Sequence, residues 1–177
     1  MRYSIIPNET KTAVVKAVHD GDSIKVQFED GEVSWIRLYG CDAPEVISNH
    51  VTKDQPHGRE SGNELRKLIK GQTVEVETLF RDQYGRMICK VNLLKEELGS
   101  DLQKIDLTKL LISEGLAWWL EEPKMDSTVK TELKSLHEYA KGKMLGLWSR
   151  QGRKLRPSTW RSRNRRFTME KEFEDLW

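Results

Sequence analysis

The feature that most constrains the fold is a run of short strand patterns, separated by tight turns, in the first half of the chain. In residues 23–28, Ile24, Val26 and Phe28 alternate with polar residues, which is the periodicity of a half-buried strand. Asp30-Gly31 then forms a hairpin signal, because Gly adopts positive φ and Asp favours turns. The same reasoning predicts five strands, at residues 12–19, 23–28, 33–39, 74–78 and 87–93.

Helical spacing follows, first between the third and fourth strands and then toward the C-terminus. Leu65 and Leu68 begin an apolar stripe that predicts a first helix, and residues 107–115 and 133–142 predict a second and a third. Residues 46–58 have no periodicity and are expected to form a long polar loop. These patterns predict an α+β fold in which a five-stranded barrel carries three α-helices. Such barrels commonly bind oligonucleotides, although a fold alone does not establish a function.

The chain has 177 residues, enough for one domain with a sizeable core. Its apolar runs are as short as Leu110-Leu111-Ile112, which excludes a membrane-spanning helix. Cys41 and Cys89 are too few for a disulfide framework or a zinc site. Both lie in strand-like runs, so we expect two reduced, buried thiols. The predicted organisation is an N-terminal extension (1–11), a barrel domain (12–149) and a C-terminal tail (150–177).

Charge is distributed unevenly along the tail. Residues 150–166 contain eight Lys and Arg and no acidic residue, and the last eleven residues are acidic. The basic stretch is typical of a phosphate-binding surface and equally of a solvated tail. The pattern alone does not decide between these two interpretations.

Three polar clusters at the ends of predicted strands hold the groups that phosphodiester cleavage needs. Asp22 and Asp42 are candidate metal ligands, since hard cations such as Ca²⁺ take carboxylate and carbonyl oxygens. Arg37 and Arg86 each offer a planar fork of N–H donors that fits two phosphate oxygens. Glu45 is then the spare carboxylate, available to take a proton from water. Each residue alone is more often a surface charge; the set together indicates hydrolysis of a phosphodiester.

The motifs around these residues occur in a characteristic order. They are Asp20-Gly21-Asp22-Ser23, then Ile36-Arg37-Leu38…Asp42-Ala43-Pro44-Glu45, then Asp82…Tyr84-Gly85-Arg86. Further motifs are Gln55-Pro56-His57-Gly58, Glu114-Gly115-Leu116-Ala117-Trp118, Gly146-Leu147-Trp148-Ser149 and Pro157…Trp160-Arg161. In order and spacing the chain resembles the staphylococcal nuclease (thermonuclease) family over residues 12–161. Such an ordered set is much more specific than one short pattern.

The resemblance implies a staphylococcal nuclease-like OB-fold barrel and a Ca²⁺-dependent phosphodiesterase that acts on DNA and RNA and leaves a 3′-phosphate. Asp22 and Asp42 match the family's metal carboxylates. Ala43 stands where the family's ligand is a backbone carbonyl, so Ala can still serve. The family uses one carboxylate as general base and two arginines to hold the scissile phosphate. These catalytic positions are matched by Glu45, Arg37 and Arg86.

The sequence departs from the family at the wall where two tyrosines pack near the nucleotide. The corresponding positions in this sequence hold Glu121 and Pro123, whose side chains cannot stack on a base as tyrosine does. The acidic pair Glu121-Glu122 would repel a phosphate if it faced the cleft. Trp118 and Tyr84 are the candidate substrate-binding residues in their place, since stacking contributes about 1–3 kcal/mol per base. Alternatively, the Trp118-Trp119 pair is split, with one ring in the core and one partly exposed.

The resemblance also leads us to expect that the tail docks in part on the barrel through Trp160 and attracts phosphate weakly. The runner-up function is a catalytically silent nucleic-acid-binding module of the same family. Such modules typically lose the metal carboxylates or the arginines, and this chain keeps all of them. The enzyme is therefore the favoured interpretation.

Expected partners are DNA and RNA substrates, with no membrane association and a monomeric protein. Met1–Pro7 stops being apolar after two residues, so no secretory signal is visible. As written, the sequence indicates a cytoplasmic protein; a trimmed N-terminus would indicate an exported one. The sequence does not choose between them.

Overall fold

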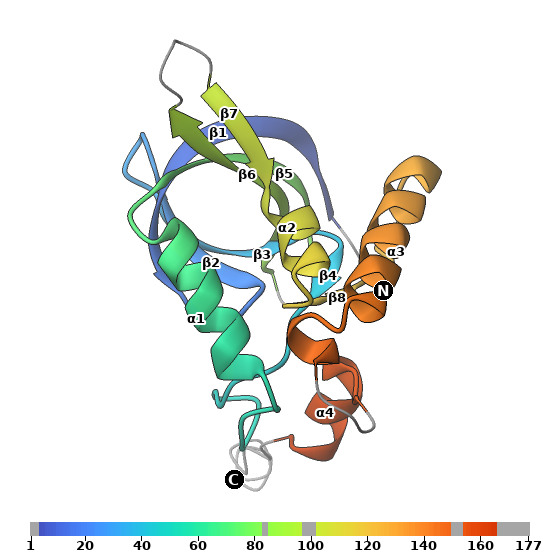
Figure 1. Cartoon of the computed structure of the whole chain (residues 1–177). Coiled ribbons are helices and arrows are strands. Elements are labelled where there is room, and N and C mark those ends of the chain that lie inside the picture. The colour runs from blue at the N-terminus through green and yellow to red at the C-terminus, as the bar shows by residue number, and fades with distance from the viewer. Residues whose placement is uncertain (1–3, 83–84, 97–101, 150–153, 166–177) are drawn as a thin grey trace, which may run out of the picture.

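Five strands curl into a closed barrel (Figure 1). They are β1 (Ser4–Val18), β2 (Ser23–Phe28), β3 (Val33–Leu38), β5 (Thr73–Arg81) and β6 (Met87–Glu96). In this computed structural model, which describes residues 4–82, 85–96, 102–149 and 154–165, the strand order is β3-β2-β1-β5-β6. A parallel pairing of β3 with β6 closes the ring, and the other neighbours pair antiparallel. The predicted five-stranded OB-fold barrel of an α+β protein is confirmed.

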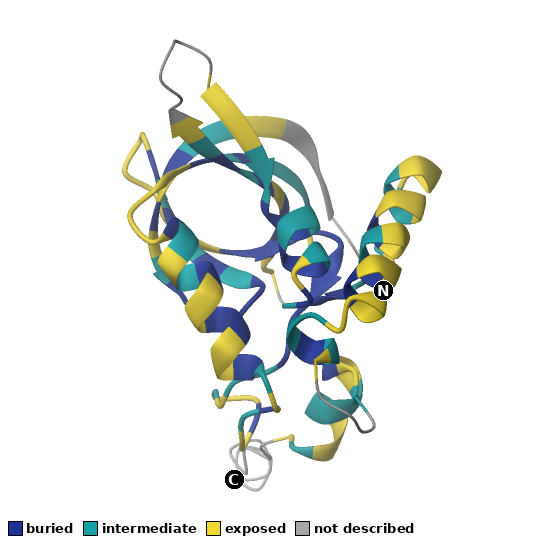
Figure 2. Ribbon diagram, viewed as in Figure 1, coloured by how far each residue is buried: buried dark blue, intermediate teal, exposed yellow. Residues whose placement is uncertain are grey.

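The core lies inside this barrel because apolar residues alternate along its strands. Ile24 and Val26 of β2 point inward and are completely buried, as are Leu38 of β3 and Leu93 of β6. Burying one such side chain stabilises the fold by about 1.5–3 kcal/mol. Figure 2 shows buried residues alternating with intermediate and exposed ones along the strands of the barrel and along α1. Both cysteines are free and buried, as predicted.

Within the barrel sheet, two strand features differ from the predictions. β1 begins at Ser4, and residues 4–11, which the sequence placed in an N-terminal extension, belong to the strand that pairs with β5. An unpredicted strand, β7 (Leu102–Asp106), extends the sheet beside β6. β7 escaped prediction because it is mostly exposed and polar, so it carries no alternating apolar pattern; Leu102 itself is 58% exposed.

The described residues form four α-helices, one more than predicted. The three predicted ones are α1 (Gly58–Ile69), α2 (Leu107–Ser113) and α3 (Ser127–Gly142). Asp106 and Asp126 cap α2 and α3 by accepting hydrogen bonds from the first-turn N–H groups. The fourth, α4 (Pro157–Arg163), lies in the tail and starts with Pro at its first turn. No helix among the described residues is long and apolar enough to span a membrane.

The tail docks on the polar loop of residues 46–58, at the end of the molecule where α4 lies in Figure 1. The indole Nε1 of Trp160 donates to the carbonyl of Lys53 at 3.1 Å, and the Thr52 N–H donates to the carbonyl of Asn164 at 2.9 Å. The Gln55 Nε2 donates to the carbonyl of Leu155 at 2.7 Å. A short helix is marginal by itself, so these contacts explain why α4 forms. The acidic end of the tail lies outside the described residues.

Candidate active site

Asp22 is carried by the tight turn between β1 and β2. Its backbone N–H donates to Asp20 Oδ1 at 3.2 Å, and its carboxylate accepts from Ser23 Oγ at 2.9 Å. A Cβ on Gly21 would lie 1.9 Å from Ser61 Oγ and 2.8 Å from Ala43 Cβ. Glycine is therefore required for the turn to press against α1. This close packing buries the Asp22 carboxylate beside the segment that carries the next acidic residues.

Asp42 and Glu45 lie on that segment. Asp42 ends β4 (Cys41–Asp42), which pairs with β8 (Trp118–Trp119). The backbone of Glu45 is held by Gln55, whose Oε1 accepts from the Glu45 N–H at 3.2 Å and whose N–H donates to the Glu45 carbonyl at 2.8 Å. A Cβ on Gly58 would lie 2.3 Å from the Glu45 carbonyl oxygen. The start of α1 thus packs directly on Glu45 and fixes its position.

Arg37 connects the acidic residues. Its Nη2 donates to Asp42 Oδ1 at 2.9 Å, to the Cys41 carbonyl at 3.1 Å and to Asp22 Oδ2 at 3.3 Å. Its Nη1 lies 3.4 Å from Glu122 Oε1. Burial alone would lower the pKa of Arg37, but the carboxylates of Asp22 and Asp42 raise it above its ordinary value. The guanidinium is therefore the fixed positive centre of a buried cluster.

An arginine of the tail, Arg161, completes this cluster. Its Nη1 donates to Asp42 Oδ1 at 3.2 Å and makes a short contact with Glu45 Oε1. The sequence placed Arg161 in the basic stretch and attached no site role to it. The only signal was the Pro157…Trp160-Arg161 motif, which had no chemistry attached. The barrel-to-tail contact joins residues more than a hundred positions apart, which no local pattern reveals.

The cluster contains more acidic than basic side chains. It has two guanidinium groups, those of Arg37 and Arg161. It has five acidic side chains, which are Asp20, Asp22, Asp42, Glu45 and Glu122. Burial, followed by the charge of neighbouring carboxylates, raises the pKa of Asp20 well above its ordinary value. Burial also raises the pKa of Glu45, although the nearby Arg161 opposes it. For Asp22, burial is outweighed by Arg37 and the Ala43 N–H, so its pKa is lowered.

Among the described residues, no group of three or more His, Cys, Asp or Glu side chains is arranged to hold a metal ion. The predicted set needs only two carboxylates, with a backbone carbonyl as the third ligand. The structure brings these three residues together, since the Ala43 N–H donates to Asp22 Oδ2 at 2.9 Å and Arg37 bridges Asp22 and Asp42. The all-oxygen chemistry and the surplus of carboxylates fit a hard divalent cation.

Arg86 lies in the turn just before β6. It pairs with Asp82, with 2.8 Å between Arg86 Nη2 and Asp82 Oδ2. Its side chain is 47% exposed. The charge of Asp82 contributes to the raised pKa of Glu122, whose largest cause is burial. Asp82, which Arg86 contacts, therefore lies near enough to Glu122 for its charge to act on that carboxylate. Tyr84, a predicted substrate-binding residue, lies outside the described residues.

Trp118 does not provide the predicted stacking surface. It is only 4% exposed and packs edge-on against Trp148, with 5.6 Å between ring centroids. Its neighbour Trp119 is half-buried, so the split arrangement of one core ring and one partly exposed ring is what the structure has. Trp118 was misassigned because a pair of tryptophans does not show which ring faces inward.

Of the two glutamates expected to affect phosphate binding, one faces the cluster. Glu122 lies against Arg37, whereas Glu121 pairs with Lys130, with 2.6 Å between Glu121 Oε1 and Lys130 Nζ. Glu122 therefore occupies one edge of the guanidinium predicted to hold a phosphate. It would compete with a phosphate for that edge.

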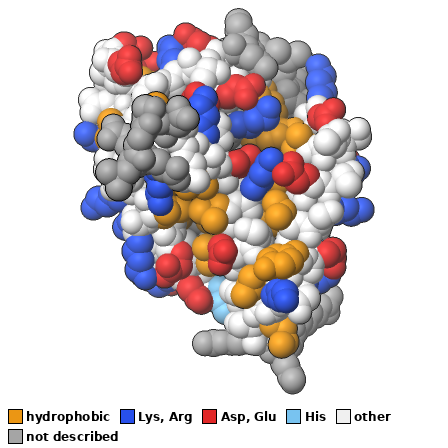
Figure 3. Space-filling model, turned by 45° about the horizontal axis from the view of Figure 1, so that its top comes forward, with side chains coloured by type: hydrophobic (Ala, Val, Ile, Leu, Met, Phe, Trp, Pro, Cys, Tyr) orange, Lys and Arg blue, Asp and Glu red, His pale blue; other side chains and the backbone are white. Residues whose placement is uncertain are grey.

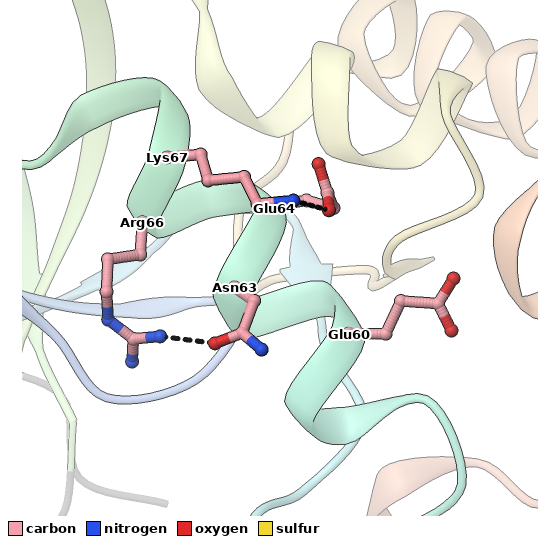
Figure 4. Close-up of a pocket in the computed structure, with 5 residues that line it drawn as sticks. All are labelled: Glu60, Asn63, Glu64, Arg66 and Lys67. Atoms are coloured by element: carbon pink, nitrogen blue, oxygen red, sulfur yellow. Dashed lines mark hydrogen bonds and ion pairs between the residues drawn. The ribbon is translucent and has the colours of Figure 1, made fainter.

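The described part of the face in Figure 3 carries charges of both signs. Figure 3 shows Lys and Arg interspersed with Asp and Glu over one face, with hydrophobic side chains gathered between them. Figure 4 shows a hollow along the exposed side of α1, where Lys67 pairs with Glu64 at 2.7 Å and Arg66 donates to Asn63 at 2.5 Å. These are the ordinary i, i+3 pairs of a solvated helix. The hollow shares no residue with the acidic cluster.

A closed five-stranded barrel with a buried carboxylate–arginine cluster at one end is an OB-type fold that carries a polar site. The family described as staphylococcal nuclease homologue matches residues 35–150. The chain therefore belongs to the staphylococcal nuclease homologue family.

Curated relatives agree with this assignment. A protein named "Uncharacterized endonuclease" from Escherichia coli O157:H7 is 32% identical over 149 residues, which cover 84% of this chain and 84% of that protein. "Protein ParB" of Escherichia coli is 29% identical over 160 residues, covering 89% and 84% respectively. "Staphylococcal-like nuclease CAN1" of Arabidopsis thaliana is 30% identical over 130 residues, covering 73% of this chain and 34% of that protein.

Proposed function

We propose that the protein is a Ca²⁺-dependent nuclease of the thermonuclease type. It hydrolyses phosphodiester bonds of DNA and RNA with little sequence specificity and leaves 3′-phosphate ends. The observation that carries this proposal is the buried cluster in which Arg37 bridges Asp22 and Asp42 while Glu45 lies beside them. Family membership and relatives whose names include endonuclease support the same reaction class.

The cation would be held by the carboxylates of Asp22 and Asp42 and the backbone carbonyl of Ala43. Oxygen donors favour Ca²⁺ over softer metals. When bound, the ion would polarise a phosphoryl oxygen and offset charge that develops on the phosphate. The surplus of carboxylates around Arg37 supports this assignment, because the acidic side chains of the cluster outnumber its two arginines.

Glu45 would act as the general base. Its carboxylate is mostly buried, and its backbone is fixed on both sides by Gln55. A positioned base of this kind contributes about 10²–10⁴-fold to the rate. Arg37 and Arg86 would stabilise the charge of the transition state, and one well-placed donor contributes about 3 kcal/mol. Arg86 would exchange its contact with Asp82 for the phosphate when substrate binds.

A cleavage assay tests the proposal. The full chain is incubated with plasmid, single-stranded DNA and RNA, with Ca²⁺ or with EDTA, and the ends of the products are analysed. We expect cleavage of all three substrates with Ca²⁺, 3′-phosphate ends, and no cleavage in EDTA. Binding without cleavage would instead support a silent nucleic-acid-binding module, and cleavage in EDTA would exclude the proposed metal.

A further inference from the structure

Arg161 reaches the acidic cluster from a helix that is not part of the barrel. We propose that Arg161 is a catalytic residue of this site and contacts the scissile phosphate of a bound nucleic acid. This inference rests on the proposed function and deepens it, since it adds a phosphate-binding group from the C-terminal tail. It gives the docked tail a direct part in the reaction.

The position of Arg161 is the first argument. Its Nη1 lies between Asp42 Oδ1, at 3.2 Å, and the carboxylate of Glu45. A water activated by Glu45 must touch both that carboxylate and the phosphorus it attacks, so the phosphate lies within one water diameter of Glu45. A guanidinium in direct contact with Glu45 is therefore within reach of the phosphate oxygens.

The availability of donors is the second argument. The Arg37 side chain is only 10% exposed, and its Nη2 is shared among three protein acceptors. The Arg161 side chain is 41% exposed, and its hydrogen bonds to described residues use Nη1 alone. A guanidinium has five N–H donors in a fork that fits two phosphate oxygens. Arg161 thus binds the cluster through Nη1, and its partly exposed side chain carries further N–H donors that these bonds do not use.

The third argument is that the tail is held by contacts other than Arg161. Trp160 donates to Lys53 and Thr52 donates to Asn164, while Gln55 links Leu155 to the backbone of Glu45. If α4 served only to block the site, its main contacts would be with the residues of the site. Here α4 is anchored on the neighbouring loop, so Arg161 is presented in a fixed position before substrate arrives, which is the condition for electrostatic catalysis.

The test compares Arg161→Gln and Arg161→Lys with Arg163→Gln, an exposed arginine of the same helix that serves as the matched control. We expect kcat of Arg161→Gln to fall by about 10²–10³-fold, the usual cost of one transition-state donor. Arg161→Lys should retain part of the activity because it keeps the charge without the fork. Arg163→Gln should cleave like the parent, and cooperative thermal melts should show that every variant is folded.

A binding measurement separates a phosphate contact from a merely structural role. The affinity for a single-stranded oligonucleotide is measured in EDTA across a range of salt concentrations. Loss of one phosphate contact should make the slope of log K against log salt shallower by about 0.7 in Arg161→Gln and leave Arg163→Gln unchanged.

Three results would overturn the inference. The first is an unchanged kcat in Arg161→Gln. The second is a raised kcat in this variant, which would show that Arg161 inhibits the site. The third is a reduced kcat together with an unchanged salt slope. If the parent protein does not cleave at all, the proposed function fails, and the binding slope still reports on Arg161 independently.

Discussion

The candidate site has two halves that differ in how they are held. Asp22 and Arg37 lie on the barrel, Asp42 ends the short strand β4 that follows β3, and all three side chains are almost completely buried. Glu45 and Arg161 lie on the loop after β4 and on the tail, and Arg161 is open to solvent. The barrel half has little freedom and its charges are desolvated. The loop-and-tail half is the part of the site that is more accessible to a substrate.

This difference separates stability from access. A buried charge whose partner is removed is costly, because neither water nor another group replaces the partner. An exposed ion pair contributes little to stability and can exchange partners cheaply. The barrel half therefore acts as the structural base of the site, and the loop-and-tail half supplies side chains that can exchange an ion pair for a ligand while their backbone stays anchored.

The largest effect on stability is expected for Arg37→Met. Removing this guanidinium leaves Asp22 buried without its ion-pair partner and leaves Asp42 with Arg161 alone, and breaking such a buried pair costs about 3–5 kcal/mol. Arg86→Gln is the control, because its pair with Asp82 is at the surface and should contribute less than about 1 kcal/mol. Urea unfolding in EDTA measures both. Equal losses in the two variants would break the distinction between buried and surface arginines.

An intermediate effect is expected for Gln55→Ala, because Gln55 joins the loop and the tail within the loop-and-tail half. Gln55 is buried and bonds both the backbone of Glu45 and the carbonyl of Leu155. Its loss leaves two partly buried polar groups unpaired, each at a cost of up to about 1–3 kcal/mol. We expect lower unfolding free energy together with reduced cleavage. A destabilised variant with parental kcat would show that Glu45 and the tail are not held through this residue.

The smallest effect is expected for a buried histidine outside both halves. Burial lowers the pKa of His137, and the opposing effect of Glu138 is smaller. Lys141 and Arg156 also lower it. Below about pH 6.5 the unfolded chain takes up a proton that the folded protein does not, so stability falls with falling pH.

The His137 contribution is at most about 1.4 kcal/mol per pH unit for one proton. Comparing the parent with His137→Gln by urea unfolding between pH 7.5 and 5 isolates it. The variant should show the shallower decline in unfolding free energy as the pH falls. Identical declines would mean that His137 takes up its proton in the folded state as well.

Much of the barrel half could be predicted from the sequence, because turns and strand alternation are local. Asp22 follows a Gly turn, and Arg37 and Asp42 leave a strand, so their placement follows from the barrel itself. The exposed strand β7 had no such pattern. The buried position of Trp118 depends on its packing against Trp148, which comes from a distant segment.

The loop-and-tail half could be predicted only in part. Glu45 was identified by chemistry, since it was the carboxylate left over after the metal ligands were assigned. Arg161 was not identified, because its contacts with Asp42 and Glu45 depend on how the tail returns to the barrel. Residues 150–166 contain eight basic residues, and the sequence does not show which of them reaches the site.

The most direct test of the central claim is the activity of Glu45→Gln, which keeps the shape of the side chain and removes its ability to take a proton. Single-turnover cleavage and oligonucleotide affinity are measured on the same preparation. The account predicts cleavage slower by about 10²–10⁴-fold with affinity near that of the parent. Cleavage at the parental rate would contradict it, because the carboxylate at the meeting point of the two halves would then have no part in the reaction.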